Sequence, residues 1–288
     1  MSGGVLWFLR SAVCASAMAA LCFVATASVA PASIEPINFD VTDSGFVNLP
    51  DTIPAGMVSL VMRNVGHSPH HAKLVLLNSG VTLEQYAAAV LQGQPTAALI
   101  TTLGGNGVLD PGVGGDEVSF DLPPGTYVVL DVLRAADGQI NAGKGLLQQV
   151  QVVDDEQGRE PADQPISTAN VTLQNFQIDG LPAALSGGRT TLRIDNAGPL
   201  AHELLAARLA PGQSADDLVR FMTTTQPSGV QPYVSVGGFQ SMDQGFGGWS
   251  SLDLSPGEYA FFCNLTVAST GKRHFEEGMI QQVTVRSS

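Results

Sequence analysis

The chain has 288 residues, 13 of them Lys or Arg and 26 Asp or Glu, so its formal net charge is −13. Such an acidic chain repels phosphate backbones and anionic lipid headgroups, which argues against nucleic-acid binding and against binding to anionic membranes. The length is sufficient for two hydrophobic cores, and three cysteines offer little stabilisation by disulfides.

Residues 1–32 predict a secretory signal peptide. They contain a single charged residue, Arg10, followed by an apolar stretch and by small residues suited to cleavage. We therefore expect an exported protein, periplasmic or extracellular, with no membrane insertion after cleavage; an uncleaved membrane anchor is the alternative. Lipid anchoring is not expected, because the large Leu21 before Cys22 fits a lipoprotein cleavage site poorly.

The rest of the sequence contains an internal repeat at a constant offset of 132 residues. Identical residues at this offset include Leu49-Pro50 and Leu181-Pro182, Asn64 and Asn196, His70 and His202, Pro124-Gly125 and Pro256-Gly257, and Tyr127 and Tyr259. After a shift of one residue, 145–150 matches 278–283. One offset held over so long a span indicates a duplicated domain.

Each copy is predicted to consist of short strands separated by turn residues. Strands are expected at 57–63, 72–77, 118–122, 126–131 and 146–153, and again at 190–194, 204–209, 258–263 and 279–285. One helix interrupts each copy, at about 82–91 and 215–223, and Ser214 suits the N-cap of the second. The glycine pairs at 104–105, 114–115, 237–238 and 247–248 lie between these strands and predict turns.

The predicted fold class is all-β, with two β-sandwiches in tandem and one short helical insertion in each. The expected boundaries are 1–32 for the signal peptide, 33–153 for the first domain, 154–165 for a linker and 166–288 for the second domain. The linker is polar, contains proline and shows no hydrophobic periodicity.

Cys263 is the only cysteine outside the predicted signal peptide, which contains Cys14 and Cys22. His274 and Met279 follow it within the same short segment. An unpaired thiol is a liability in an exported protein, so a thiol that shares a segment with an imidazole and a thioether suggests a soft-metal site, most readily copper.

Three motifs of the second copy resemble the cupredoxins, the family of blue-copper proteins. The stretch 196–202 is similar to the loop that presents the first copper histidine in plastocyanin-like proteins, and 256–263 is similar to the strand that leads into the ligand loop. Four residues separate His274 from Met279, a spacing common in that family. The resemblance implies Greek-key sandwiches and one copper ion held by His202, Cys263, His274 and Met279.

This set of ligands suits copper chemistry. A thiolate and two imidazoles form a trigonal set, and a weak axial thioether favours the cuprous state. The chain departs from the small electron carriers of the family because ten residues separate Cys263 from His274, although some copper nitrite reductases also have a longer ligand loop. We expect this segment to turn near Gly271 and to be mobile until copper orders it.

Each of these residues also has a purely structural interpretation. Cys263 and Met279 fit core positions, and His202 and His274 fit surface or hydrogen-bonded histidines. Two alternatives therefore stay open. The protein is a metal-free binding or surface module with the same fold, or it is a thiol-redox protein in which Lys272 and His274 lower the pKa of Cys263.

The first copy lacks most of this set. It keeps His70 but has Asp131, Asn141 and Leu146 at the positions that correspond to Cys263, His274 and Met279, so we expect no blue-copper site there. Asp131 is predicted to be hydrogen-bonded near the end of the sandwich. The cluster of His67, His70 and His71 is either an open imidazole set for a metal or, more simply, a solvated loop.

The resulting hypothesis is an exported copper protein for one-electron transfer or copper handling. We expect no enzymatic activity, because five histidines and no His-x-His pair are too few for the further copper ions of a multicopper oxidase or nitrite reductase. Lys272 and Arg273, beside His274, form either a docking patch for an acidic redox partner or only a solvated loop. The sequence does not give the oligomeric state.

Overall fold

The computed structural model describes residues 1–4, 34–154, 163–225 and 229–288. Most of the predicted signal peptide and most of the predicted linker lie outside these ranges. The chain divides into two compact units, Met1–Ala30 and Pro31–Ser288, and every helix and strand belongs to the second unit. None of the described helices is long and apolar enough to cross a membrane.

The described residues are mainly strands, and the order of elements is the same in the two halves of the second unit. The first half contains β1 (Pro36–Thr42), β2 (Gly45–Val47), β3 (Thr52–Pro54), β4 (Gly56–Asn64), β5 (His70–Leu77), α1 (Leu83–Leu91), β6 (Ile100–Leu109), β7 (Asp116–Leu122), β8 (Gly125–Leu130), the 3-10 helix η1 (Asn141–Lys144) and β9 (Leu147–Val153). The second half contains β10 (Ala169–Gln174), β11 (Gln177–Asp179), β12 (Ala184–Ser186), β13 (Gly188–Asn196), β14 (His202–Leu209), α2 (Ala215–Thr223), β15 (Tyr233–Met242), β16 (Gly247–Leu254), β17 (Gly257–Phe262), the 3-10 helix η2 (His274–Glu277) and β18 (Ile280–Arg286). The predicted all-β class, with one short helix in each half, is confirmed.

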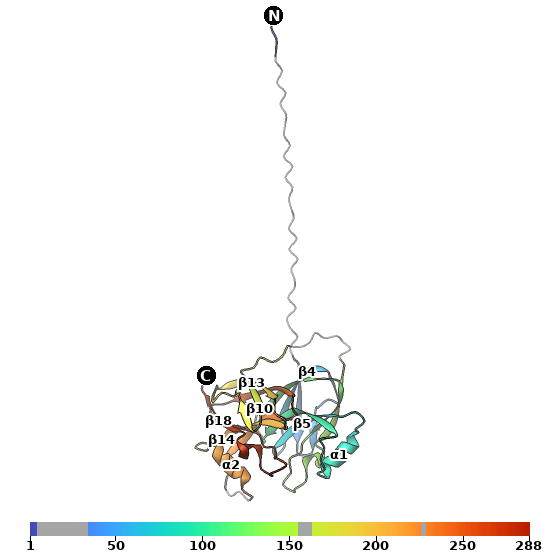
Figure 1. The fold of residues 1–288 in the computed structure, drawn as a ribbon, viewed down its shortest axis with the longest axis vertical. Coiled ribbons are helices and arrows are strands. Elements are labelled where there is room, and N and C mark those ends of the chain that lie inside the picture. Colours follow the sequence, from blue (N-terminus) through green and yellow to red (C-terminus); the bar gives the residue numbers. More distant parts are fainter. Residues whose placement is uncertain (5–33, 155–162, 226–228) are drawn as a thin grey trace. The chain divides into compact units, whose positions relative to one another are not determined.

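The strands form two sheets, and each half contributes strands to both (Figure 1). The eight-stranded sheet has the order β11-β10-β13-β16-β7-β4-β1-β2, and the ten-stranded sheet has the order β12-β18-β17-β14-β15-β6-β5-β8-β9-β3. The halves are joined by antiparallel pairing of β16 with β7 and of β15 with β6. The strands of 33–153 and 166–288 therefore share both sheets within one compact unit, and the division into two domains stays a prediction.

The core lies between the sheets, in a single cluster that includes Leu74 of the first half and Phe261 of the second. In β17, Phe261 faces this core, whereas Ala260 and Phe262 belong to a separate cluster that also contains Leu218 of α2. Side chains alternate along a strand, so Cys263, one residue beyond β17, also faces the core between the sheets. Figure 1 shows α1 and α2 on opposite sides of the strands.

The helices begin and end close to the positions that the sequence predicts. Ser214 is the N-cap of α2, where its hydroxyl accepts a hydrogen bond from the Asp217 N–H (3.3 Å) and Asp217 Oδ2 accepts one from the Ser214 N–H (2.9 Å). Thr82 and Gln85 form the same capping box at the start of α1. Both boxes satisfy backbone donors that the first turn of a helix leaves free.

Three of the four predicted glycine turns are wrong, because these glycine pairs lie in strands. Gly104–Gly105 and Gly237–Gly238 lie inside the central strands β6 and β15, and Gly247–Gly248 begins β16. A Cβ atom on Gly107 would lie 2.4 Å from the carbonyl carbon of Gly237, so the two halves approach so closely that a side chain does not fit. Because glycine has a low strand propensity, the sequence pattern did not predict the central strands β6 and β15.

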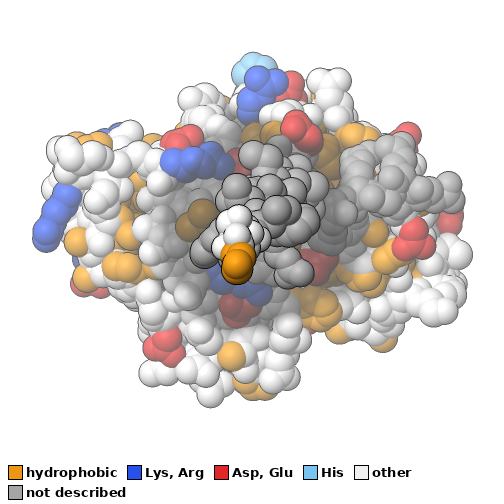
Figure 2. Space-filling model, turned by 90° about the horizontal axis from the view of Figure 1, so that it is seen from above, with side chains coloured by type: hydrophobic (Ala, Val, Ile, Leu, Met, Phe, Trp, Pro, Cys, Tyr) orange, Lys and Arg blue, Asp and Glu red, His pale blue; other side chains and the backbone are white. Residues whose placement is uncertain are grey.

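Exposed ion pairs make little contribution to the stability of this fold. On the face shown in Figure 2, Lys and Arg side chains lie apart from one another, among Asp and Glu side chains. The ion pairs Arg63–Asp40 (2.8 Å) and Lys144–Asp137 (3.2 Å) involve partly or largely exposed groups. Exposed pairs of this kind contribute about 0–1 kcal/mol each, so the shared core dominates stability.

Candidate metal centre

His202 is the first residue of β14, and a buried asparagine fixes the loop that presents it. The Asn196 side-chain amide donates to the carbonyls of Leu200 (2.8 Å) and Met242 (3.0 Å) and accepts from the Gly198 N–H (3.0 Å). A Cβ atom on Gly198 would lie 3.0 Å from His202 Nε2, so this position favours glycine. The imidazole is fully buried, and its Nε2 has no hydrogen-bond partner among the described residues.

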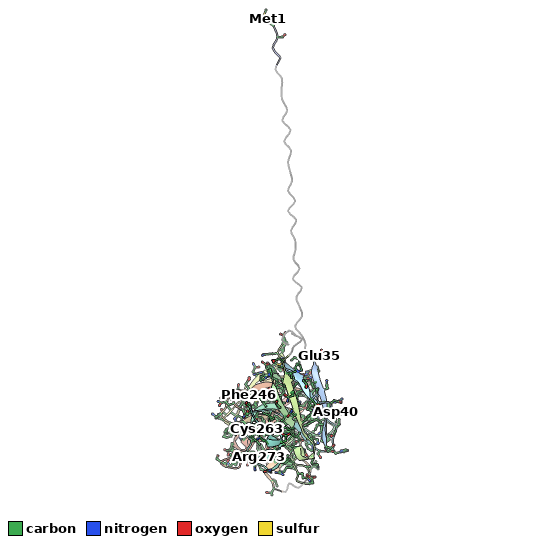
Figure 3. All side chains as sticks on the ribbon, turned by 90° about the vertical axis from the view of Figure 1, so that its right-hand side faces the viewer. Met1, Glu35, Asp40, Phe246, Cys263 and Arg273 are labelled. Atoms are coloured by element: carbon green, nitrogen blue, oxygen red, sulfur yellow. The ribbon has the colours of Figure 1, made fainter. Side chains whose placement is uncertain are left out.

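The segment between Cys263 and His274 is a short hydrogen-bonded hairpin arm and not an open loop. Thr266 and Arg273 form an antiparallel bridge, the Val267 N–H donates to the Lys272 carbonyl (2.8 Å), and the His274 N–H donates to the Leu265 carbonyl (2.8 Å). Gly271 turns the arm with a φ of 74°, as the sequence predicts. These bonds hold His274 near Cys263 despite the ten intervening residues. In Figure 3 Arg273 lies toward the end of the strands opposite Glu35.

Backbone bonds also tie Met279 to the two other residues of its segment. The Met279 N–H donates to the His274 carbonyl (3.0 Å), the Cys263 N–H donates to the Met279 carbonyl (3.1 Å), and the Phe275 N–H donates to the Cys263 carbonyl (3.0 Å). The Met279 side chain is fully buried in the same core cluster as Cys263. The chain therefore brings the thioether residue to the same end of the core as the thiol.

Three ligand atoms, one each from His202, Cys263 and His274, lie within 4.8 Å of one another. The two Nδ1 atoms of the histidines are 3.1 Å apart, and Cys263 Sγ is 3.3 Å from His274 Nδ1. All three side chains are buried, with exposures of 0%, 0% and 2%. In the ranges that the structure describes, this is the one group of at least three His, Cys, Asp or Glu residues with such a geometry.

Burial keeps the three side chains uncharged. It lowers the pKa of His202 to about 4, with a further contribution from the neighbouring His274, and it lowers the pKa of His274. Burial, with the nearby Glu203 carboxylate, raises the pKa of the Cys263 thiol. Neutral imidazoles are the form that binds a metal, whereas the thiol must lose its proton on binding.

Phe176 closes the site from the turn between β10 and β11. Its ring packs edge-on against His274, with ring centroids 4.9 Å apart, and more distantly against His202 (6.5 Å). The residue has a positive φ of 63°, a conformation that non-glycine residues seldom adopt. The sequence did not identify Phe176, because the turn lies outside the strands and motifs that the pattern shows.

These residues fit a copper ion. In a trigonal set, ligand atoms about 2 Å from a common ion lie about 3.5 Å from one another, close to the 3.1 and 3.3 Å separations found here. The donors are two neutral imidazoles and a thiol, with a thioether residue held nearby, which is the set that favours copper over hard cations.

The first half builds the same backbone arrangement around different side chains. The Asp131 N–H donates to the Leu146 carbonyl (2.9 Å), the Leu146 N–H to the Asn141 carbonyl (3.2 Å), and the Ala142 N–H to the Asp131 carbonyl (2.7 Å). Asn64 holds the loop before His70 through the carbonyls of Ser68 and Leu109, as Asn196 does in the second half.

The side chains of the first half form a hydrogen-bonded cluster. Asp131 Oδ2 lies 2.7 Å from His70 Nδ1 and accepts from the Asn141 amide (2.9 Å), which confirms the predicted hydrogen bonding of Asp131. His70 Nε2 lies 3.1 Å from Asp43 Oδ1, in the turn between β1 and β2. The sequence missed Asp43 for the same reason as Phe176.

The prediction for the three neighbouring histidines is wrong in both of its forms. His70 and His71 are buried, with exposures of 1% and 4%, and only His67 is exposed. His71 Nε2 accepts from the Val132 N–H (2.9 Å). His70 is hydrogen-bonded through both ring nitrogens and His71 through Nε2 alone. Because two of the three rings are buried, the three residues form neither an open imidazole set nor a solvated loop.

The cluster shifts the pKa values of its members in opposite directions. Burial lowers the pKa of His70, but the bonds to Asp131 and Asp43 outweigh this effect and raise it. Burial lowers the pKa of His71. The pKa of Asp43 is lowered because its bonds to His67, His70 and Ser68 outweigh its desolvation.

The basic pair Lys272 and Arg273 is engaged locally. Lys272 Nζ lies 3.2 Å from Glu277 Oε1, and the Arg273 side chain donates to the Asn264 carbonyl (2.9 Å). The Arg273 N–H donates to Glu276 Oε2 (2.7 Å). Glu277 therefore pairs with the charge of Lys272, whereas the Arg273 guanidinium binds a neutral carbonyl, and the acidic redox partner stays a prediction.

No family model matches the chain, and no curated protein matches it. Among solved structures it is similar to a dithionite-reduced auracyanin from the photosynthetic bacterium Roseiflexus castenholzii, at 15% identity and a TM-score of 0.29, over 41% of this chain and 94% of that one. It is also similar to a multicopper oxidase (16%, TM-score 0.26, 88% of this chain and 89% of that one). A third is the Cu-containing nitrite reductase from Thermus scotoductus SA-01 (12%, TM-score 0.25, 86% and 61%). Likeness at these TM-scores carries no conclusion about function.

The prediction that the protein is not an enzyme is contradicted. The two matches that extend over most of the chain, the multicopper oxidase and the nitrite reductase, are enzymes, although the likeness is weak. The count of histidines on which that prediction rested addresses only further copper ions. It does not exclude catalysis by other residues, so we withdraw the exclusion.

Proposed function

We propose that the protein binds one copper ion at His202, Cys263 and His274, with Met279 as a weak axial ligand, and that it serves in one-electron transfer or copper handling outside the cytoplasm. The observation that carries the proposal is the convergence of three buried ligand atoms from β14, the end of β17 and η2 within 4.8 Å. Bound copper would supply a centre that changes oxidation state by one electron.

The residues around the site would limit movement of the ligand side chains when bound copper changes its oxidation state. The Asn196 bonds, the hairpin arm and the backbone bonds of Met279 fix the donor residues from three sides. Phe176 and the surrounding core keep water away from the imidazoles. A site held in this way needs little movement of its ligands, which favours rapid electron exchange.

His274 is the candidate ligand that communicates with the surface. It lines a hollow together with Phe176, Leu200, Ala201 and Leu265, whereas His202 does not line it. We propose that a redox partner docks over this largely apolar hollow, with His274 as the nearest ligand.

The thiol-redox alternative receives less support from the site. Cys263 is fully buried, and its thiol has a raised pKa, whereas reactive thiols are accessible and have a lowered pKa. The metal-free module is the remaining alternative. It would place two buried imidazoles and a buried thiol together for no structural gain.

Titration of the purified protein with Cu(II) tests the proposal. We expect about one equivalent to bind and to give an intense visible thiolate-to-copper band. Cys263→Ser should abolish this band, and Met279→Leu should keep binding but shift the band or the reduction potential. Met62→Leu, which changes a fully buried methionine of the first half, is the matched control and should leave the band unchanged.

The outcome that overturns the proposal is colourless protein at saturating copper. In that case the reaction of the metal-free protein with a thiol reagent separates the two alternatives. Rapid reaction of Cys263 under native conditions supports the thiol-redox protein, and protection supports the metal-free module.

A further inference from the structure

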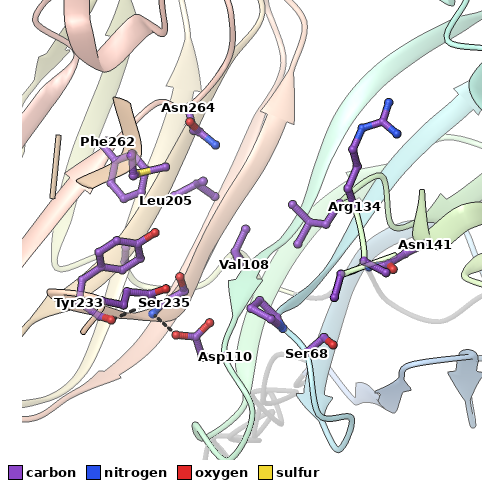
Figure 4. Close-up of a pocket in the computed structure, with 17 residues that line it drawn as sticks. Ser68, Val108, Asp110, Arg134, Asn141, Leu205, Tyr233, Ser235, Phe262 and Asn264 are labelled. Atoms are coloured by element: carbon purple, nitrogen blue, oxygen red, sulfur yellow. Dashed lines mark hydrogen bonds between the residues drawn. The ribbon is translucent and has the colours of Figure 1, made fainter. Parts of the chain in front are cut away.

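A cavity of about 370 Å³ lies where the two halves meet (Figure 4). The first half contributes Val108 and Leu133, and the second contributes Leu205, Met222 and Phe262. Its walls are mainly apolar, and its volume falls in the range of small-molecule sites. None of the four candidate metal ligands lines it.

Two polar side chains converge on this apolar space. The Asp110 carboxylate is held in place by one oxygen, Oδ2, which accepts a hydrogen bond from the Ser235 N–H (3.0 Å). Its other oxygen accepts none from the described residues. The Tyr233 hydroxyl points into the cavity in Figure 4 and likewise has no hydrogen-bond partner within the described ranges.

The charge in the cavity is negative, and no cationic side chain of the described residues pairs with it. Arg134 also lines the cavity, but its guanidinium donates to the Gly138 carbonyl (2.8 Å), and Figure 4 shows it directed away from Asp110. Burial raises the pKa of Asp110, and burial with the nearby Asp110 charge raises the pKa of Tyr233 to about 12. Both shifts indicate a carboxylate that a positive group would stabilise.

We propose that this cavity binds a small organic cation, an amine with an aromatic or branched aliphatic body. The ammonium group binds Asp110 and the Tyr233 hydroxyl, and the apolar body packs against Phe262, Leu205 and Val108. A neutral molecule of the same shape leaves the carboxylate unpaired, and an anion is repelled by it. The net charge of −13 also favours the approach of a cation.

The site does not require copper, because the ligand contacts Asp110 and residues of β6, β14, β15 and β17 but none of the candidate metal ligands. Phe262 and Asn264 flank Cys263 in the sequence, so the cavity is adjacent to the metal site but not part of it. Failure of copper binding and failure of amine binding are therefore distinguishable.

Calorimetric titration of the copper-free protein with 2-phenylethylammonium tests the inference, with 2-phenylethanol and 3-phenylpropanoate as matched neutral and anionic probes. A charge-assisted hydrogen bond contributes about 1.5–3 kcal/mol, so the amine should bind roughly tenfold or more tightly than the alcohol. Asp110→Asn keeps an acceptor for the Ser235 N–H and should remove this preference. Asp121→Asn, at an exposed carboxylate of β7, should leave it intact.

A second variant tests whether the probes bind inside the cavity or are only attracted to the negative charge of the protein. Val108→Phe fills the space and should abolish binding of both the amine and the alcohol, while thermal unfolding checks that the variant is folded. Equal affinity for the three probes overturns the inference. Amine binding that survives Asp110→Asn or Val108→Phe in folded protein also overturns it.

Discussion

The two halves of the molecule carry the same backbone bonds around two different kinds of site. Cys263, His274 and Met279 of the second half and Asp131, Asn141 and Leu146 of the first are joined by matching backbone hydrogen bonds. The second half gathers neutral nitrogen and sulfur donors, and the first gathers carboxylates and amides around His70.

These matching backbone hydrogen bonds, here called the backbone frame, form around different side chains in the two halves, so the frame does not depend on the side chains that it holds. In the first half Asp43 of the β1–β2 turn lies against His70, and in the second Phe176 of the β10–β11 turn packs over His274. One turn thus supplies a charged partner where the other supplies an aromatic cover. In the first half, where the metal donors are absent, the same frame surrounds a hydrogen-bonded cluster centred on His70.

The largest expected effect is the gain of a second copper site. The triple change Asp131→Cys, Asn141→His and Leu146→Met places the full donor set on the matching frame, with His70 already present. The amount of copper bound per protein should rise from about one equivalent in wild type to about two in this variant. Addition of His70→Ala should return it to one. A stoichiometry that stays at one in the folded triple variant would show that the two frames differ in a way the backbone bonds do not reveal.

Loss of the buried carboxylate of the first half comes next. Asp131→Ala removes the acceptor for His70 and Asn141 and should lower the free energy of unfolding by about 3–5 kcal/mol, because a buried charged partner is left unpaired. Asp137→Ala, in the exposed pair with Lys144, should have a much smaller effect, because solvent screens this pair. Urea unfolding measures both. Equal losses in the two variants would contradict a special role for the cluster.

A smaller effect is the opposite pH dependence of the contributions that His70 and His71 make to the free energy of unfolding. The pKa of His70 is raised, so its stabilising contribution is complete below its ordinary value of 6.5 and is lost as pH rises through the raised value. The pKa of His71 is lowered, so its contribution is present above 6.5 and is lost as pH falls through the lowered value. The nearby ionisable groups are Asp43 and Asp131 for His70, and Asp131 and Lys73 for His71.

The measurement is the free energy of unfolding from pH 5 to pH 9 for wild type, His70→Gln and His71→Gln. The wild-type advantage over His70→Gln should shrink as pH rises, and the advantage over His71→Gln should shrink as pH falls. Parallel pH profiles for the two variants would show that their environments are alike.

The smallest effect concerns the hairpin arm of the second half. The sequence predicts a mobile segment, but the structure shows backbone bonds at Val267 and His274, matched in the first half at Ala135 and Asn141. We therefore expect measurable hydrogen-exchange protection of these amides without copper and only a modest increase with copper. The arm of the first half is the internal control. Exchange at the rate of an unfolded peptide in the second arm alone would restore the mobile-loop prediction.

Local patterns predicted the elements whose signals are short-range. Ser214 and Asp217 predict the start of α2, and short runs of strand-forming residues between turn residues predict β4, β5, β8 and β17. The glycine-rich β6 and β15 were missed, because strand propensity does not register two backbones that approach too closely for side chains. The short edge strands β2, β3, β11 and β12 were missed because three residues carry too little pattern.

The sequence by itself determined the all-β class, the helices and the set of residues with metal chemistry, since residue type and spacing encode these directly. Only the tertiary structure decided that His202, Cys263 and His274 converge. It also decided that Asp43 contacts His70 and that Phe176 packs against His274. The sharing of both sheets by the two halves was likewise decided at this level. These are contacts between residues far apart in the sequence. Strand pairing and core packing set their distances, and no local pattern records them.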